Sequence, residues 1–355
     1  MEAIRKKIEA ILNEYEQKNE KDLAIATICS HSSLQLLYSA KRLGFKTIGI
    51  TTKNRKKTYE AFNASKPDEF IVVDHISEFP DSELLARNAL VIPHGSLVEY
   101  VGEIIFKLEV PLFGNRMSLL WEKDREKMIE WLRSANIKTP KTFKNKDEID
   151  RLCIVKLPGA KGGMGYELVS SPEEFEQKFP NYDGKAVIQE FLVGVRIYPH
   201  LFFSPLSTSG YKTDKGTIEL LGVDRRIETS ADEIYRAHAA GLKKQPSFVV
   251  IANEPIVIRE SLLPIIFNYS ERIIEKSFEL FGGMIGPFCL ELLVTDTLDV
   301  YAFEVSARIV AGTSIFVNSS PYALFTHGEP ISMADRIMEE IHLALKTKKL
   351  KQIFF

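Results

Sequence analysis

The stretch from Val155 to Val169 reads VKLPGAKGGMGYELV and places four glycines and two lysines between two apolar, strand-like runs. Glycine is entropically costly in a strand or turn, so this density marks a backbone that turns tightly or closely approaches something. Such a turn can hold phosphates through backbone N–H groups and lysine charge. It lacks the GK[ST] ending of a P-loop and the GxGxxG spacing of a dinucleotide site. Two interpretations therefore fit: a phosphate-covering hairpin, or a flexible hairpin without a ligand.

The composition is that of a folded protein with more than one unit. A chain of 355 residues exceeds one ordinary core, so two or three packed units are expected. The 46 basic and 48 acidic residues nearly cancel, which argues against a nucleic-acid partner held on a basic face. No apolar run is long enough to cross a bilayer, and residues 1–17 are typical of an amphipathic helix rather than a signal peptide. We therefore expect a cytoplasmic protein with no membrane partner and with buried, reduced thiols.

Strands and helices alternate through the first third of the chain. After the opening helix, short β-branched runs alternate with amphipathic stretches as far as VPLFGN, residues 110–115. This order predicts a parallel sheet of βαβ units that ends near Asn115. Residues 117–137 are expected to form one long amphipathic helix, followed by a break at Pro140.

The pattern then changes to that of antiparallel strands. A compact α+β unit is expected from the strand-like runs 153–158, 165–170, 186–192 and 197–204 with a helix at 171–179. A last region combines strands with long helices at 262–281 and 331–347, and residues 231–248 have no clear period and indicate an insertion or loop. The expected division is an N-terminal helix at 1–20 and units at 21–117, 118–200 and 201–355.

Two glutamates stand inside otherwise apolar strands. Glu291 lies in FCLELLV and Glu304 in YAFEVSARIVAG. A buried carboxylate needs a cation or strong donors, and two inward carboxylates on neighbouring strands would suit Mg²⁺ bridging nucleotide phosphates. The alternative is a pair of structural salt bridges to Arg308 or Arg259; for the two glutamates together we favour the metal.

Polar residues follow two strands of the expected parallel sheet. The segment CSHSS places Ser30–Ser33 between a strand and a helix, and PHGSL repeats the pattern with His94 and Ser96. Open α/β sheets bind ligands at this edge, with anions on helix N-termini. Helix capping would explain one serine but not the histidine at position 31.

These pieces together resemble the ATP-grasp superfamily, in which the nucleotide lies between a glycine-looped lid and a closing domain. The resemblance extends to the archaeal formate-dependent, PurP-type synthetases of purine synthesis. It rests on segments from about residue 24 to 345, namely SHSSLQLLYSAKRLGFKTI, VIPHGSLVEYVG, FGNR, IVKLPGAKGGMGY, QEFLVGVRIYPHLFFS, DRRIE, ANEPIVIRESLL, GPFCLE and FEVSARIVAGTSIFVNSSPY. It implies an α/β and α+β fold with an N-terminal parallel-sheet pre-ATP-grasp domain, a small lid and a C-terminal closing domain that carries the metal site.

The resemblance also implies roles for individual residues. ATP would be bound by the lid, by a hinge strand whose backbone reads adenine, and by one acidic residue: Lys156, Gly159, Lys161, Gly162, Gly163, Gly165, Gln189, Glu190, Phe191, Leu192 and Glu228. Without the resemblance, Glu228 would be an exposed loop carboxylate. Glu291 and Glu304 would hold Mg²⁺ or Mn²⁺.

The acceptor, 5-aminoimidazole-4-carboxamide ribonucleotide (AICAR), would be bound by His31, Ser32, Ser96 and Asn253. His31 is a hypothetical proton acceptor, and Arg308 would pair with phosphate or formate, because a planar guanidinium suits both. The alternative for Arg308 is an ion pair with Glu260 or Glu304.

The implied reaction is ATP- and formate-dependent formylation of AICAR through formyl phosphate, which yields the formamido product (FAICAR) on the route to IMP. The implied enzyme is an ADP-forming C–N ligase, expected as a homo-oligomer. Two alternatives stay open: an ATP-grasp carboxylate–amine ligase with another acceptor, and a nucleotide-binding regulatory protein without turnover.

Overall fold

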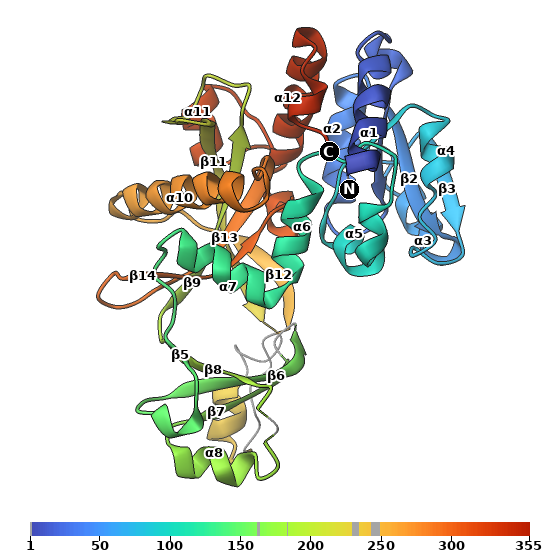
Figure 1. The fold of residues 1–355 in the computed structure, drawn as a ribbon. Coiled ribbons are helices and arrows are strands. Elements are labelled where there is room, and N and C mark those ends of the chain that lie inside the picture. The colour runs from blue at the N-terminus through green and yellow to red at the C-terminus, as the bar shows by residue number, and fades with distance from the viewer. Residues whose placement is uncertain (1, 162–163, 183, 229–233, 243–248) are drawn as a thin grey trace.

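The computed structural model describes residues 2–161, 164–182, 184–228, 234–242 and 249–355. Three sheets organise these residues, and Figure 1 shows one of them, with a single helix on it, set apart from the other two. Six short 3-10 helices lie at Glu20–Asp22, Gly102–Phe106, Lys146–Glu148, Glu260–Leu262, Ala311–Phe316 (η5) and Leu350–Gln352 (η6). None of the described helices is long and apolar enough to cross a membrane.

The first sheet is parallel, as expected, with the order β3-β2-β1-β4. Its strands are β1 (Ala24–Ile28), β2 (Lys46–Thr52), β3 (Glu69–Val73) and β4 (Ala89–Val91), joined or followed by α2 (Ser33–Arg42), α3 (Lys53–Glu60), α4 (Asp81–Leu85) and α5 (Gly95–Tyr100). The expected last strand at 110–115 is reduced to isolated bridges: Leu112 pairs in parallel with Val91 of β4, whereas Phe113 and Gly114 bridge to Phe354. Pro111 has no N–H to donate, and Gly114, at φ +83°, turns the chain away.

The expected long helix at 117–137 is divided in two. α6 (Arg116–Lys123) ends at Asp124, whose extended backbone then begins α7 (Arg125–Ser134). The Asp124 carboxylate accepts hydrogen bonds from the N–H groups of Glu126 and Lys127. An aspartate in this role is a strong N-cap, which explains why the chain starts a new helix here.

The second sheet belongs to a small lid-like unit. Its order is β5-β8-β6-β7, from β5 (Thr142–Phe143), β6 (Cys153–Lys161), β7 (Met164–Val169) and β8 (Val187–Glu190). All its pairings are antiparallel, and α8 (Pro172–Lys178) packs Phe175 into its core. The strands on either side of Gly162 and Gly163 are therefore paired antiparallel, as expected for a hairpin.

The third sheet carries the closing unit, with the order β10-β11-β9-β13-β14 and β12 paired to β11. Its strands are β9 (Val195–Ser204), β10 (Tyr211–Thr213), β11 (Gly216–Glu228), β12 (Val250–Pro255), β13 (Gly286–Val294) and β14 (Val300–Ser306), and α9 (Ile234–Ala239) lies between β11 and β12 in the chain. We expected residues 197–204 in the small unit, which is wrong. β9 is buried along nearly its whole length and pairs with both β11 and β13. Its buried backbone N–H and C=O groups therefore find hydrogen-bond partners only in a central position of the larger sheet.

One face of this sheet packs against two helices. The core there joins inward residues of β9, β11 and β13 with Trp131 of α7 and Ile273 of α10 (Leu263–Phe281). The Trp131 indole N–H donates to the Ile273 carbonyl, 3.0 Å away. The opposite face is therefore the one left for polar side chains near the lid.

The two ends of the chain pack together. α1 (Glu2–Tyr15) and α12 (Met333–Thr347) share a core with Leu350 and Phe354 of the tail. Figure 1 shows the two termini close to each other beside the parallel sheet. The apolar helix and tail thus cover their own chain, while the expected homo-oligomer stays a prediction.

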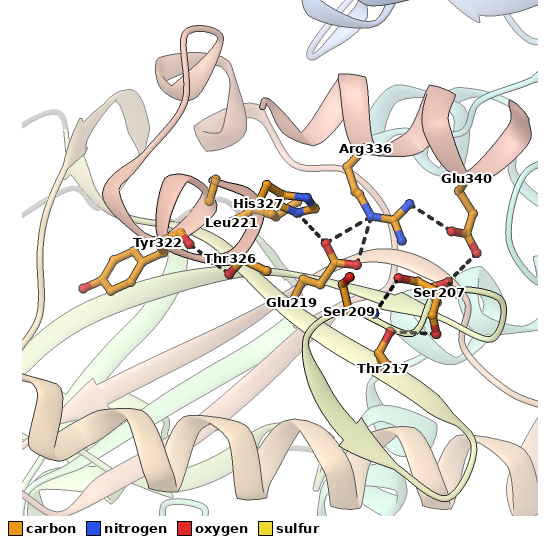
Figure 2. Close-up of polar contacts among 12 residues, drawn as sticks. Ser207, Ser209, Thr217, Glu219, Leu221, Tyr322, Thr326, His327, Arg336 and Glu340 are labelled. Carbon is orange, nitrogen blue, oxygen red and sulfur yellow. Dashed lines mark hydrogen bonds and ion pairs between the residues drawn. The ribbon is translucent and has the colours of Figure 1, made fainter. Parts of the chain in front are cut away.

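A buried charged network ties α12 to the closing sheet (Figure 2). Arg336 Nε donates to both carboxylate oxygens of Glu219 on β11, at 2.9 and 3.0 Å, and its Nη1 donates to Glu340, 2.9 Å away. His327, at the end of α11 (Pro321–His327), lies 2.8 Å from Glu219. Both glutamate side chains are fully buried, so their charges depend on these partners.

Candidate active site

Polar side chains from neighbouring strands share one face of the closing sheet. Asp224 is paired with Tyr198, Arg226 with Asn253, and Glu291 with Glu304. Residues directly opposite each other on paired strands face the same side of a sheet. Together with His31 from the parallel-sheet unit, this face lines a cavity of about 430 Å³.

The two glutamates expected at a metal stand opposite each other on β13 and β14. Arg226 Nη2 donates to Glu291 Oε1, 2.8 Å away, and the guanidinium of Arg226 lies 3.7 Å from the centre of the Tyr198 ring. The ion pair of Glu291 is thus with Arg226, not with Arg308 or Arg259. Burial, followed by the charges of Glu291 and Glu122, raises the pKa of Glu304 to about 8.

This arrangement fits a divalent cation shared with a substrate. Two carboxylates share this wall, and burial, more than the charges of neighbouring carboxylates, raises the pKa of Glu304, so a bound cation would stabilise its charged form. Within the described ranges, no three His, Cys, Asp or Glu side chains gather closely enough to hold a metal themselves. Mg²⁺ typically takes one or two carboxylates and completes its shell with waters and substrate phosphates.

Arg308 pairs with a glutamate that sequence reasoning missed. Its Nη2 lies 2.8 Å from Glu122 Oε1 on α6, and the other oxygen of Glu122 accepts from the Ala307 N–H at 2.8 Å. Burial raises the pKa of Glu122, against the opposing effect of Arg308. Neither Glu260 nor Glu304 is the partner of Arg308, and its guanidinium remains at the cavity wall.

His31 reaches the cavity from the turn between β1 and α2. Its backbone is left-handed, at φ +52°, and its ring stacks on His94 with centroids 5.3 Å apart. Burial, followed by the charges of His94 and Arg308, lowers the pKa of His31 to about 2. The imidazole is therefore neutral and serves as a hydrogen-bonding group rather than a cation.

Ser32 and Ser96 hold this wall together. Ser32 Oγ lies 2.6 Å from His31 Nδ1, and Ser96 Oγ donates to Ser30 Oγ at 2.9 Å. Ser32 precedes α2 without forming a side-chain cap, so capping does not explain it. His31 lines the cavity, whereas the two serines do not.

A second cavity of about 360 Å³ adjoins the first and shares Arg196, Tyr198, Arg226 and Glu228 with it. Phe191 and Leu192 line it from the segment after β8. The Phe191 N–H donates to the Leu152 carbonyl, 2.9 Å away. Within the described part of the chain the Leu192 N–H has no hydrogen-bond partner, so it is available as a backbone donor to a ligand.

Glu228 and Glu190, two of the residues expected to bind ATP, form ion pairs in different places. Glu228 forms an ion pair with Arg196 at 3.0 Å on the cavity wall. Glu190 instead pairs with Arg151 at 3.0 Å, and it does not line the second cavity. Its carboxylate therefore stabilises the lid in this structure, and the contact with ATP expected of Glu190 stays a prediction.

Lys156 is a half-buried cation of the lid, on β6. Its Nζ donates to Gln189 Oε1, 2.8 Å away, and burial, followed by the charge of Arg125, lowers its pKa to about 8. The backbones of Gly159 and Gly165 lie in β6 and β7, and Lys161 is paired with Met164 across the hairpin. Gly162 and Gly163 lie outside the described residues.

Sequence reasoning missed Arg196, His200, Asp224 and Arg226, although a signal was present. In β11 the charged residue Arg225 obscures the polar face formed by Asp224, Arg226 and Glu228, but in β9 the polar residues Arg196, Tyr198 and His200 alternate with Ile197 and Pro199. Such alternation marks a strand with one polar face. The residues of these two polar faces line the main cavity.

Comparisons with known proteins cover nearly the whole chain. Residues 25–143 match a family described as "Protein of unknown function (DUF1246)", and residues 180–354 match one described as "Domain of unknown function (DUF1297)". The chain is 48% identical to the 5-formaminoimidazole-4-carboxamide-1-(beta)-D-ribofuranosyl 5'-monophosphate synthetase of Methanothrix thermoacetophila, over 98% of this chain and 99% of the relative. It is 43% identical to the protein of the same name from Korarchaeum cryptofilum, over 99% of both chains.

Solved structures with a similar fold are also found. The fold is similar to the IMP biosynthesis protein PurP of Thermococcus kodakaraensis, with a TM-score of 0.74 and 30% identity, over 93% of this chain and 100% of that one. The N5-carboxyaminoimidazole synthetase of Staphylococcus aureus, complexed with ADP, shares the fold at a TM-score of 0.58 and 14% identity, over 92% of this chain and 79% of that one. The ATP-grasp architecture expected from the sequence is confirmed.

Proposed function

The chain belongs to the family of the 5-formaminoimidazole-4-carboxamide ribonucleotide synthetases, and we propose that it formylates AICAR at the expense of ATP and formate. The observation that carries the proposal is the cavity in which Glu291 and Glu304 of the closing sheet meet His31 of the parallel-sheet unit. The two carboxylates that would act at the phosphates and the histidine that would bind the acceptor therefore line the same cavity. This is what a ligase that joins an activated acid to an amine requires.

ATP would span the two adjoining cavities. The adenine would lie in the second one, where the Leu192 N–H is available, and the phosphates would run past Glu228 and Arg226 toward the carboxylate pair. Lys156 and the glycine hairpin, with Lys161, would cover the phosphates from the lid side. Glu291 and Glu304 would hold Mg²⁺ or Mn²⁺, which neutralises phosphate charge when bound.

The reaction would proceed in two transfers. A formate oxygen attacks the γ-phosphorus of ATP, the bond to the bridging oxygen breaks, and ADP leaves with that oxygen. The AICAR amine then attacks the formyl carbon, loses a proton, and releases phosphate that retains the formate oxygen. Arg308 would neutralise the developing charge on formate or phosphate, and His31 would accept a hydrogen bond from the amine.

An omission assay tests this function. ADP release is expected only when ATP, Mg²⁺, formate and AICAR are all present, because the acyl phosphate is protected until the amine consumes it. ADP release with another acid or amine would favour a different carboxylate–amine ligase. Tight ATP binding without turnover for any acceptor would favour a regulatory protein.

The pKa of Lys156 predicts how ATP binding depends on pH. A lysine whose pKa is about 8 is charged below pH 8 and loses its charge above it, whereas bound phosphates raise the pKa again. ATP affinity should therefore fall about tenfold from pH 7 to pH 9, the value of one charged hydrogen bond. Fluorescence titration with an ATP analogue measures this. Lys156→Met should lose this decrease in affinity, and the exposed lid lysine variant Lys144→Met should keep it.

Glu122 is expected to act through Arg308. Glu122→Gln keeps the shape but removes the charge that holds the guanidinium, so kcat/KM for formate should fall about tenfold or more while KM for ATP changes little. Steady-state kinetics with each substrate varied in turn distinguishes an effect on formate from an effect on ATP. The exposed neighbour Glu126 offers the control Glu126→Gln. Equal losses for formate and ATP would contradict this role.

A further inference from the structure

Asn253 lies at the edge of the main cavity, and its hydrogen bond with Asp224 determines how its side-chain amide is oriented. Its Nδ2 donates a short hydrogen bond to Asp224 Oδ2. A carboxylate only accepts hydrogen bonds, so the nitrogen must face Asp224 and the amide oxygen Oδ1 must face away from it. In the described parts of the chain no group donates to that oxygen, and Asn253 lines the cavity. The side chain therefore offers the cavity an acceptor.

Asp224 is itself packed from two sides. His200 Nε2 lies 2.8 Å from Asp224 Oδ1 without a hydrogen bond between them, and both side chains are only 1% exposed, so the imidazole packs against this carboxylate oxygen. The backbone of Gly312 packs on the same carboxylate: a Cβ at that position would lie 2.8 Å from Asp224 Cγ. Because Asp224 cannot turn away, the orientation of the Asn253 amide follows from it.

We propose that Asp224, packed between His200 and Gly312, is a positioning residue that makes Asn253 select an acceptor nucleotide carrying an N–H donor, the carboxamide of AICAR. This rests on the proposed function. The reacting amine must turn its lone pair to the formyl carbon and lose a proton, so the carboxamide NH₂ is the donor that persists through the reaction. A nucleotide with a carboxylate in its place would set an oxygen against the Asn253 oxygen, close to the charge of Asp224, and would be rejected.

The test compares binding of AICAR and of its carboxylate analogue by calorimetry. Wild type should prefer the carboxamide. In Asp224→Asn the partner of Asn253 can donate or accept, so the amide is free to flip and the preference should fall about tenfold. Glu254→Gln, an exposed change beside Asn253, should leave the preference as in wild type.

A residue exchange separates positioning from a merely structural role. In the double variant Asp224→Asn with Asn253→Asp, the new amide donates to the new carboxylate, whose second oxygen again faces the cavity. The carboxamide preference should return. An unchanged preference in Asp224→Asn, or no recovery in the exchange, would overturn the proposal. ADP release by wild type, measured in parallel, tests the proposed function separately, because the binding preference does not depend on turnover.

Discussion

Glu304→Gln is expected to lower kcat for ADP release by about a thousandfold or more, because it removes one of two charges that would hold the cation on the phosphates. Glutamine keeps the size of the side chain and one accepting oxygen, so the cavity wall stays in place. Mn²⁺ binding followed by electron paramagnetic resonance should weaken in parallel. The exposed helix residue Glu279 offers the matched control Glu279→Gln.

The stability of the same variant separates a lost site from a lost fold. The pKa of Glu304 is raised from 4.5 to about 8 in the folded chain, so ionisation of this group opposes folding increasingly as pH rises between these values. With a chelator present at pH 7.5, Glu304→Gln should therefore melt at the same temperature as wild type or higher. Full activity in Glu304→Gln, or a melting temperature far below that of wild type, would contradict this account.

Arg336→Met should cost about 3–5 kcal/mol of the free energy of unfolding, because it leaves Glu219 and Glu340 buried without their shared cation (Figure 2). Methionine fills much the same space and can still pack on Phe202, whose ring centre lies 4.3 Å from the guanidinium carbon. The loss is therefore electrostatic rather than a cavity effect. Urea unfolding followed by circular dichroism measures it.

Two further variants make the Arg336 experiment specific. Lys346→Met removes an exposed charge from the same helix, α12, and should change stability little. Replacing Glu219, Arg336 and Glu340 together with apolar residues of similar volume should restore most of the loss, because no buried charge then lacks a partner. A loss below about 1 kcal/mol in Arg336→Met would show that the network contributes little.

The features that local sequence patterns encode were predictable. Alternating strands and helices indicated the parallel sheet, and the glycine-rich stretch indicated a hairpin. Glu291 and Glu304 stood out because a carboxylate within an apolar strand demands a partner. They lie directly opposite each other across β13 and β14, so both carboxylates face the same side of the sheet, where one cation could be shared between them.

The partners of those groups were not predictable, because they depend on contacts between distant parts of the chain. Arg226 is 65 positions away from Glu291, and they meet only because β9 lies between β11 and β13. Glu122 is part of a polar run in a helix, where nothing distinguishes it from a solvent-exposed residue until α6 packs beside β14. The assignment of β9 failed for the same reason, since a strand does not carry the identity of its sheet.

The central claim is that the Glu291–Glu304 site activates formate as an acyl phosphate for the amine. The most direct test supplies formate labelled with ¹⁸O, together with ATP, Mg²⁺ and AICAR, and analyses the released phosphate by mass spectrometry. We predict one labelled oxygen in each phosphate, because the formate oxygen that attacks phosphorus stays with it. Product and ADP formed together with unlabelled phosphate would contradict the account.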